Sequence, residues 1–270
     1  MPERPDGSHQ VLVAVAHGSA DPRAAATITD LMAVSAERAA ARGLHLPELR
    51  TAYLGHAAPS LRQVMGAIGP VRSGGVTVLP LLLTAAYHSK TDIPRVLAGV
   101  AQEFPRLRVT YGPPLGPHPL LLSALERRLG EADPLGPAGS ADPARRAQTG
   151  VVLAAAGSTD PEANAVIARL AARWQARSGW FAVRPASAAA ATPEAPTPAE
   201  AVTALLRAGA RRVLVATYLL APGLFADRIR VSALAAGAAA VSPALGASPE
   251  VAEVLLDRYQ EAGTLGQRAA

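Results

Sequence analysis

Two histidines at the ends of apolar segments are the residues of this chain best suited to chemistry. His17 directly follows the apolar run Val11–Ala16, and His88 comes shortly after the run Val76–Leu82. Neutral imidazole binds Fe, Co, Ni, Cu or Zn ions, and it can also accept a proton near neutral pH, because its reference pKa is about 6.5. The pattern suggests metal binding or proton transfer, with a purely structural pair of hydrogen-bonding residues as the alternative.

The other histidines are weaker candidates. His56 follows the strand candidate 49–54 and is equally well interpreted as a third member of the site or as a solvated loop residue. His118 precedes a proline at the expected start of a helix, which is more typical of a helix cap than of a functional residue. His9 and His45 lie in polar flanks, and we expect both at the surface.

Charged side chains near the two central histidines add further candidates. Asp92, four residues after His88, either caps the following helix, which we favour, or orients the imidazole or binds the metal itself. Lys90, Arg23 and Arg95 lie near expected helix starts, where they could pair with substrate carboxylates. Each of the three taken alone is more typical of a solvated surface charge.

Several chemistries are excluded by what the sequence lacks. There is no cysteine, which excludes disulfides, thiolate zinc sites, Cys-ligated Fe–S clusters and a cysteine nucleophile. The G-x-x-x-x-G-K-[ST] and G-x-G-x-x-G motifs are absent, so nothing predicts ATP or dinucleotide binding. Ser19 is not part of a G-x-S-x-G nucleophile elbow.

Composition limits the partners of the chain. The 26 basic and 21 acidic side chains leave a net charge of only +5, and aromatic residues make up 4% of the 270 residues. Few bases could stack on so few rings, so we expect no nucleic acid, whereas a small polyanionic ligand fits the charge. No uncharged apolar run reaches the roughly 20 residues of a membrane span, and no signal peptide is visible, so we expect a soluble cytoplasmic protein with no membrane partner.

Strand and helix patterns alternate in the first half of the chain. The expected strands are 11–16, 49–54, 76–82 and 107–111, and the expected helices begin near Asp21-Pro22, Pro59, Asp92 and Pro119. Four such βα units predict an α/β fold in which a four-stranded parallel sheet carries helices on both faces.

The same pattern begins again after residues 130–149, which are rich in Gly, Pro and Ala. The segment 151–161 repeats 12–22 almost position for position, and later matches follow in the same order at spacings of 130–139 residues. We therefore expect a tandem duplication, with an N-terminal domain at 1–130, a linker at 131–149 and a C-terminal domain at 150–270.

The duplication separates residues that serve the fold from residues that serve chemistry. Gly18, Asp21 and Pro22 have counterparts in the second copy, so we assign them to the joint between strand and helix. The histidines do not: His17 corresponds to Ala156, His88 to Phe225 and His118 to Ser248. Because the second copy lacks both central imidazoles, we consider a functional role for His17 and His88 as well supported as a structural one. The same comparison assigns the chemistry to the N-terminal half.

Four segments resemble the sirohydrochlorin chelatase family, the ATP-independent class II chelatases. They are HGSADPRA at 17–24, YLGHAAPSL at 53–61, VLPLLLTAAYHSKTDIP at 78–94 and PLGPHPLL at 114–121. The resemblance implies two chelatase-like domains, each a four-stranded parallel sheet with helices on both faces, that face each other across a cleft. It also implies that only one of the two copies keeps the site.

The resemblance further implies the reaction: insertion of Fe²⁺ or Co²⁺, with Ni²⁺ as a further substrate metal, into the polycarboxylate tetrapyrrole sirohydrochlorin, without ATP or an Fe–S cluster. It implies a place in sirohaem or cobalamin biosynthesis. His17 and His88 match the histidines that hold the metal and take up the pyrrole protons. The residues expected to contact the substrate are Ser19, Arg23, His56, Lys90 and His118.

In one place the chain departs from the family pattern, and two other functions stay open. Many members carry an acidic residue at the end of strand two, where this chain has Gly55-His56, so His56 is a candidate to replace it. The alternatives are a non-catalytic carrier of tetrapyrrole or metal and a chelatase for another modified tetrapyrrole. Two halves in one chain make a monomer sufficient, although a homodimer is compatible with the pattern.

Overall fold

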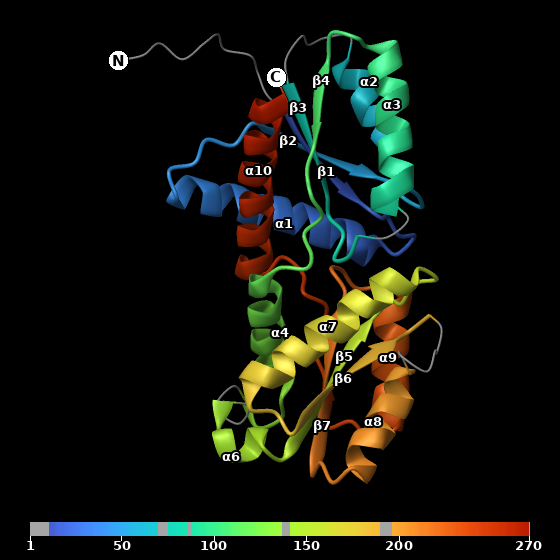
Figure 1. Cartoon of the computed structure of the whole chain (residues 1–270), viewed down its shortest axis with the longest axis vertical. Helices are drawn as coiled ribbons and strands as arrows, with labels where there is room; N and C mark the ends of the chain where they lie inside the picture. Colours follow the sequence, from blue (N-terminus) through green and yellow to red (C-terminus); the bar gives the residue numbers. More distant parts are fainter. Residues whose placement is uncertain (1–10, 70–74, 86–87, 137–140, 190–195, 270) are drawn as a thin grey trace. The chain divides into compact units, whose positions relative to one another are not determined.

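The computed structural model describes residues 11–69, 75–85, 88–136, 141–189 and 196–269 (Figure 1). The side chains of residues 88–89 and 265–269 lie outside this description, as does His9. The described chain forms two four-stranded sheets, in which every pair of neighbouring strands is parallel. The predicted fold class is thereby confirmed.

The first sheet has the strand order β2-β1-β3-β4. Its central strand β1 is fully buried, as its apolar composition predicts for a strand covered on both faces. The strands agree with the expected ranges to within two residues: β1 (Val11–Ala16), β2 (Glu48–Tyr53), β3 (Gly75–Pro80) and β4 (Arg108–Tyr111).

Helices begin in this half where the sequence signals them. Asp21 caps the first helix by accepting a hydrogen bond from the backbone N–H of Arg23 at 2.9 Å, and Pro22 is its first residue. Ser60 and Gln63 form a capping box at the start of the second helix. The helices are α1 (Pro22–Ala41), α2 (Leu61–Ile68), α3 (Ile93–Glu103) and α4 (Pro119–Ala132).

The second sheet repeats this arrangement with the strand order β6-β5-β7-β8. The shared order confirms that the repeat in the sequence is a repeat of the fold. Its strands are β5 (Thr149–Ala155), β6 (Ala182–Ser187), β7 (Arg212–Tyr218) and β8 (Ala240–Val241). The helices of this half are α6 (Pro143–Arg146), α7 (Pro161–Ser178), α8 (Pro198–Arg207), α9 (Leu224–Ala235) and α10 (Pro249–Ala269).

Each sheet buries alternate residues against helices. In the first sheet, Val11, Val13 and Val15 pack in one cluster with buried residues of α2 and α3. In the second sheet, Val152 and Ala154 pack in the same way with α8 and α9. Because side chains alternate across a strand, the residues between them line the opposite face of each sheet.

The last helix of each sequence half belongs to the compact unit of the other half. One unit comprises residues 1–115 and 252–270, and the other comprises 116–251. Helix α4 contacts β7 and β8 of the second sheet, whereas α10 approaches the first, where a Cβ at Gly112 would lie 3.0 Å from the Cβ of Ala262. These units differ from the expected domains 1–130 and 150–270, because periodicity shows that a helix has an apolar face but not which sheet that face covers.

The stretch expected to be a linker is anchored in the second unit. Helix α4 continues to Ala132, and the next residue, Asp133, is buried. Its carboxylate accepts a hydrogen bond from the Arg212 guanidinium at 2.5 Å at the start of β7. Proline and glycine content therefore marked the place where the repeat begins again, and the described residue Asp133 within it is held by Arg212.

None of the described helices is long and apolar enough to cross a membrane.

Candidate functional site

His17 is the first residue after β1, and its side chain is exposed. The backbone N–H of Gly55, just beyond β2, donates to the His17 carbonyl at 3.1 Å, and the N–H of Leu54 donates to the Ala16 carbonyl at 3.0 Å. The ends of β1 and β2 are therefore held together beyond the strands themselves. This fixes the backbone that carries the first candidate imidazole.

The turn after His17 needs glycine. Gly18 has φ 89°, and a Cβ there would lie 1.7 Å from the Gly55 carbonyl oxygen. The second copy repeats the constraint, because Gly157 has φ 88° and a Cβ there would lie 1.8 Å from Ser187 Oγ. Because the second copy keeps this glycine and has Ala156 in place of the histidine, we assign Gly18 to the joint, which forms without an imidazole in the second copy.

Ser19 has the same structural role in both copies. Its Oγ accepts a hydrogen bond from the Asp21 N–H at 3.1 Å, and Ser158 Oγ accepts one from the Asp160 N–H at 3.0 Å. These bonds tighten the turn into each helix. They account for the serine without a substrate, so contact between Ser19 and a tetrapyrrole stays a prediction.

His88 opens a π-helical turn, His88–Asp92, which leads directly into α3. The corresponding helix of the second copy, α9, begins at Leu224 without such a turn. Single π turns are rare and occur frequently at functional sites. The two copies thus differ in backbone as well as in residue type at this position, which supports a special role for the His88 segment.

The expectation that Asp92 caps α3 through its side chain is wrong. Asp92 occupies the capping position but makes no side-chain capping bond there. Its backbone is already helical, with φ −69° and ψ −50°, because the π turn precedes it. A capping side chain normally needs an extended backbone at this position.

Three histidines follow three neighbouring strands of the first sheet. His56, His17 and His88 come after β2, β1 and β3, in that spatial order. The chain leaves β1 towards β2 on one side and returns to β3 on the other, and such a switch point is where open α/β sheets bind ligands. His45 is also exposed, but it precedes β2 and so belongs to the opposite edge.

No closed metal cage is formed by the described residues: they contain no group of three or more His, Asp or Glu side chains that could hold an ion.

Arg23 carries positive charge into the first turn of α1. Its guanidinium donates to both carboxylate oxygens of Asp21, at 2.6 Å for the closest contact, while 53% of the side chain stays exposed. This side-chain hydrogen bond is the largest cause that lowers the pKa of Asp21. The counterpart in the second copy is Glu162. A helix N-terminus favours an anion, so only the first copy keeps a cation against the helix dipole.

His118 acts as the cap of α4. Its Nδ1 accepts a hydrogen bond from the Leu120 N–H at 3.3 Å, and the residue belongs to the second compact unit. The helix-cap interpretation is confirmed. Lys90 is exposed within the π turn.

Sequence reasoning missed the backbone conformation of His56. It has φ 58°, and among the described residues it is the one non-glycine with positive φ. Nothing in the local sequence marks it beyond the glycine that precedes it. Its neighbour Gly55 donates to the His17 carbonyl, across the ends of β2 and β1.

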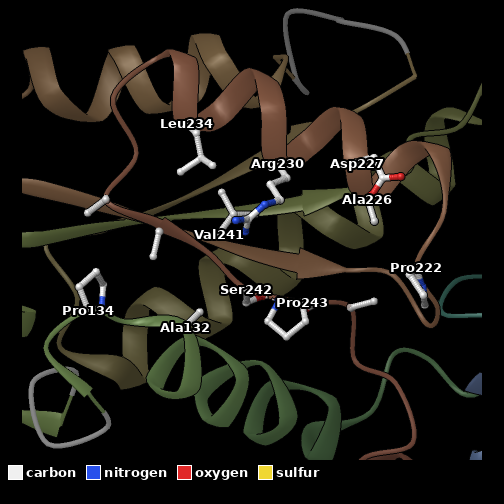
Figure 2. Close-up of a pocket in the computed structure, with 13 residues that line it drawn as sticks. Ala132, Pro134, Pro222, Ala226, Asp227, Arg230, Leu234, Val241, Ser242 and Pro243 are labelled. Atoms are coloured by element: carbon white, nitrogen blue, oxygen red, sulfur yellow. Dashed lines mark hydrogen bonds between the residues drawn. The ribbon is translucent and has the colours of Figure 1, made fainter. Parts of the chain in front are cut away.

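A hollow of about 470 Å³ lies in the second unit between α9 and β8 (Figure 2). Its lining includes Arg230 and Leu234 from α9 and Val241 from β8, and Figure 2 shows these side chains directed towards the same space. It contains none of the residues expected to bind metal or substrate. We therefore do not assign the candidate chemistry to this pocket.

A family model named CbiX matches the chain twice, at residues 11–132 and 150–262. The chain belongs to the CbiX family. The two matches coincide with the two halves of the repeat. Similar proteins are named as sirohydrochlorin chelatases, the family that the four sequence segments resemble. Two proteins of Priestia megaterium, a sirohydrochlorin cobaltochelatase and a sirohydrochlorin ferrochelatase, are each 26% identical to this CbiX chain over 67% and 70% of its length. The resemblance to the chelatase family is confirmed.

These alignments cover 56% and 66% of the two relatives, so the chain spans less than two thirds of either. Solved structures show the same fold over a greater length. SirB from Bacillus subtilis with Fe³⁺ aligns with a TM-score of 0.75 and 24% identity over 94% of this chain and 95% of SirB. The CbiX described as the terminal enzyme of sirohaem biosynthesis in denitrifying bacteria aligns with a TM-score of 0.61 and 22% identity over 94% and 99% of the two chains.

Proposed function

We propose that this protein inserts a divalent metal ion, Fe²⁺ or Co²⁺, into sirohydrochlorin, and that His17 and His88 bind the ion during transfer. The observation that carries the proposal is the pair of histidines after β1 and β3, at the switch point of one sheet, with Ala156 and Phe225 in the matching places of the other half. Membership of the CbiX family and the names of its relatives support the same reaction.

Weak metal binding suits this reaction. A cage of four protein ligands would retain the ion, whereas two imidazoles leave several positions to water and let the ion pass to the pyrrole nitrogens. As the ion leaves, a neutral imidazole can accept a proton that the macrocycle releases. No nucleotide is needed for this exchange of ligands, in keeping with the absence of the phosphate-binding motifs from the sequence.

The carboxylates of the substrate need cations at the same edge. Arg23 and Lys90 lie in the turns that follow the two histidines, and both side chains are exposed. The guanidinium of Arg23 is held against the favourable direction of the helix dipole, at a place where the second copy has an acid. A substrate carboxylate would pair with this cation and would also be stabilised by the helix N-terminus.

The proposal is tested by multiple-turnover metal insertion under anaerobic conditions. Sirohydrochlorin is mixed with catalytic amounts of protein and with Fe²⁺, Co²⁺ or Ni²⁺ in parallel, and the absorbance of the macrocycle is followed. We expect turnover with Fe²⁺ or Co²⁺. Binding of one equivalent of tetrapyrrole without turnover would replace the proposal by a carrier function, and turnover only with another tetrapyrrole would change the substrate.

The site assignment is tested by His17→Ala and His88→Ala. We expect each variant to lose metal insertion by at least about a hundredfold, the usual size of an acid–base contribution, while its circular dichroism stays unchanged. His17 is exposed, and the second copy folds with alanine in its place, so the substitution should leave the fold intact. His45→Ala, an exposed histidine at the opposite edge, is the control. Full activity in both site variants would contradict the assignment.

A further inference from the structure

His56 combines an exposed imidazole with a backbone conformation that residues with a Cβ rarely adopt. Its φ of 58° lies in the left-handed region, where glycine causes less strain. The chain nevertheless has histidine here, directly after Gly55. Backbone outliers of this kind cluster at functional sites, so the observed conformation justifies the question of what the imidazole does.

The backbone of His56 is tied to that of His17. Gly55, its neighbour, donates to the His17 carbonyl, and the Gly55 carbonyl oxygen lies where a Cβ of Gly18 would be. Gly18 and Gly55 form this close backbone contact. His17 directly precedes Gly18 and His56 directly follows Gly55, so each histidine is the chain neighbour of one of the two glycines. Both side chains are exposed, so both are accessible to an ion arriving from solvent.

The second copy has the same backbone contact without either imidazole. There, the Ala188 N–H donates to the Ala155 carbonyl at 3.0 Å, and the Ala189 N–H donates to the Ala156 carbonyl at 2.8 Å. By this register Ala189 corresponds to Gly55, and the next residue in the sequence, Ala190, corresponds to His56. The joint thus forms with Ala156 in place of His17, and both imidazoles are absent from the sequence of the second half.

We propose that His56 is a third metal-binding imidazole, which takes up the hydrated ion together with His17 before the ion passes to the tetrapyrrole. Each imidazole displaces one water from the ion, so the step requires no oxidant and no further reactant. Two imidazoles on adjacent strand ends hold an ion loosely enough for transfer. The transfer step rests on the proposed function, whereas the binding step does not.

The binding step is tested by titration of the full-length protein with Co²⁺ alone, followed by visible absorption and calorimetry. The variants are His56→Gly, which fits the left-handed backbone, and His56→Asn, which also tolerates it and keeps a polar side chain. Changes around a metal ligand typically cost 10–100-fold in affinity, so we expect both variants to weaken Co²⁺ binding about tenfold or more. His45→Asn removes an exposed histidine from the opposite edge and should leave the affinity unchanged.

The result that overturns the inference is wild-type Co²⁺ affinity in both His56 variants, or an equal loss in His45→Asn. The thermal unfolding midpoint, Tm, of His56→Gly should equal or exceed that of the wild type, because glycine fits the left-handed backbone. An unchanged or higher Tm shows that weaker Co²⁺ binding results from the loss of a ligand and not from the loss of the fold. In the insertion assay, His56→Gly should raise the KM for the metal and change kcat little, whereas His17→Ala lowers kcat. If the wild type inserts no metal, the proposed function fails, and the Co²⁺ titration still decides the role of His56.

Discussion

At the residue scale, the strongest constraint on the candidate site acts on its glycine. Gly18 combines a left-handed backbone with a contact that excludes any side chain, because the Gly55 carbonyl occupies the place of a Cβ. In the second copy Gly157 has the same left-handed backbone, with Ser187 Oγ in the place of a Cβ, and no histidine precedes it. The requirement of the fold for glycine is therefore separate from that of the chemistry for histidine. His17 is thus a residue that the joint tolerates and Gly18 is one that it needs.

Gly18→Ala should therefore destabilise the protein far more than a comparable substitution elsewhere. Left-handed strain and the clash with a backbone oxygen together predict a loss of about 3 kcal/mol in the free energy of unfolding. Gly43→Ala is the control, because Gly43 has φ 65° but open space around it, and should cost about 1 kcal/mol. Urea denaturation measures both, and equal losses would show that the close approach of Gly55 has no energetic weight.

At the element scale, one carboxylate on α4 joins this helix to three side chains of the second unit. Glu126 Oε1 accepts hydrogen bonds from the indole N–H groups of Trp174 and Trp180, at 2.6 and 3.0 Å, and Oε2 accepts one from Arg146 at 2.7 Å. The Arg146 guanidinium also stacks 4.4 Å from the Trp180 ring centroid. These are the two tryptophans of the chain, so its tryptophan fluorescence reports on the docking of α4.

Glu126→Ala should destabilise the second unit by about 3 kcal/mol, because it leaves two largely buried indole N–H groups without their acceptor and removes the carboxylate partner of the Arg146 guanidinium. Glu131→Ala, on the same helix, removes exposed ion pairs with Arg127 and Arg128 and should cost less than about 1 kcal/mol. Denaturation followed by tryptophan fluorescence measures both changes. Similar midpoints for the two variants would contradict the anchoring role of Glu126.

At the scale of the whole molecule, the exchange of α4 and α10 decides how the two halves depend on each other. Each sheet takes a helix from the other half of the sequence. In the first unit, Arg38 pairs with Glu253 at 2.9 Å and Arg42 with Asp257 at 3.3 Å, which tie α1 to α10. Neither sequence half therefore contains all the helices that cover its own sheet.

A break in the chain within residues 137–140 should leave the two fragments associated, because each supplies a helix that buries apolar surface in the unit of the other. We expect co-expressed fragments to purify as a 1:1 complex by size-exclusion chromatography with light scattering. Each fragment expressed by itself should aggregate or self-associate through its uncovered sheet. Two separate, folded monomers would show that the exchanged helices contribute little.

The sequence by itself determined the fold class, the duplication and the half that carries the histidines. Strand and helix periods, Asp-Pro caps and the repeat of 12–22 at 151–161 are local signals, so they are legible without the structure. The difference between His17 and Ala156 needed only the alignment of the two copies. These inferences agree with the structure because each depends on neighbours in the sequence.

Only the tertiary structure decided which sheet each last helix covers, that the Asp133 carboxylate is buried against Arg212, and that the backbone at His56 is left-handed. These features depend on contacts between segments far apart in the chain, and a helical period or a proline-rich stretch carries no information about them. The π turn at His88–Asp92 is likewise a feature of the folded backbone that no sequence motif predicted. The sequence supplied the imidazoles, and packing between the ends of β1 and β2 determined the backbone that carries His17 and His56.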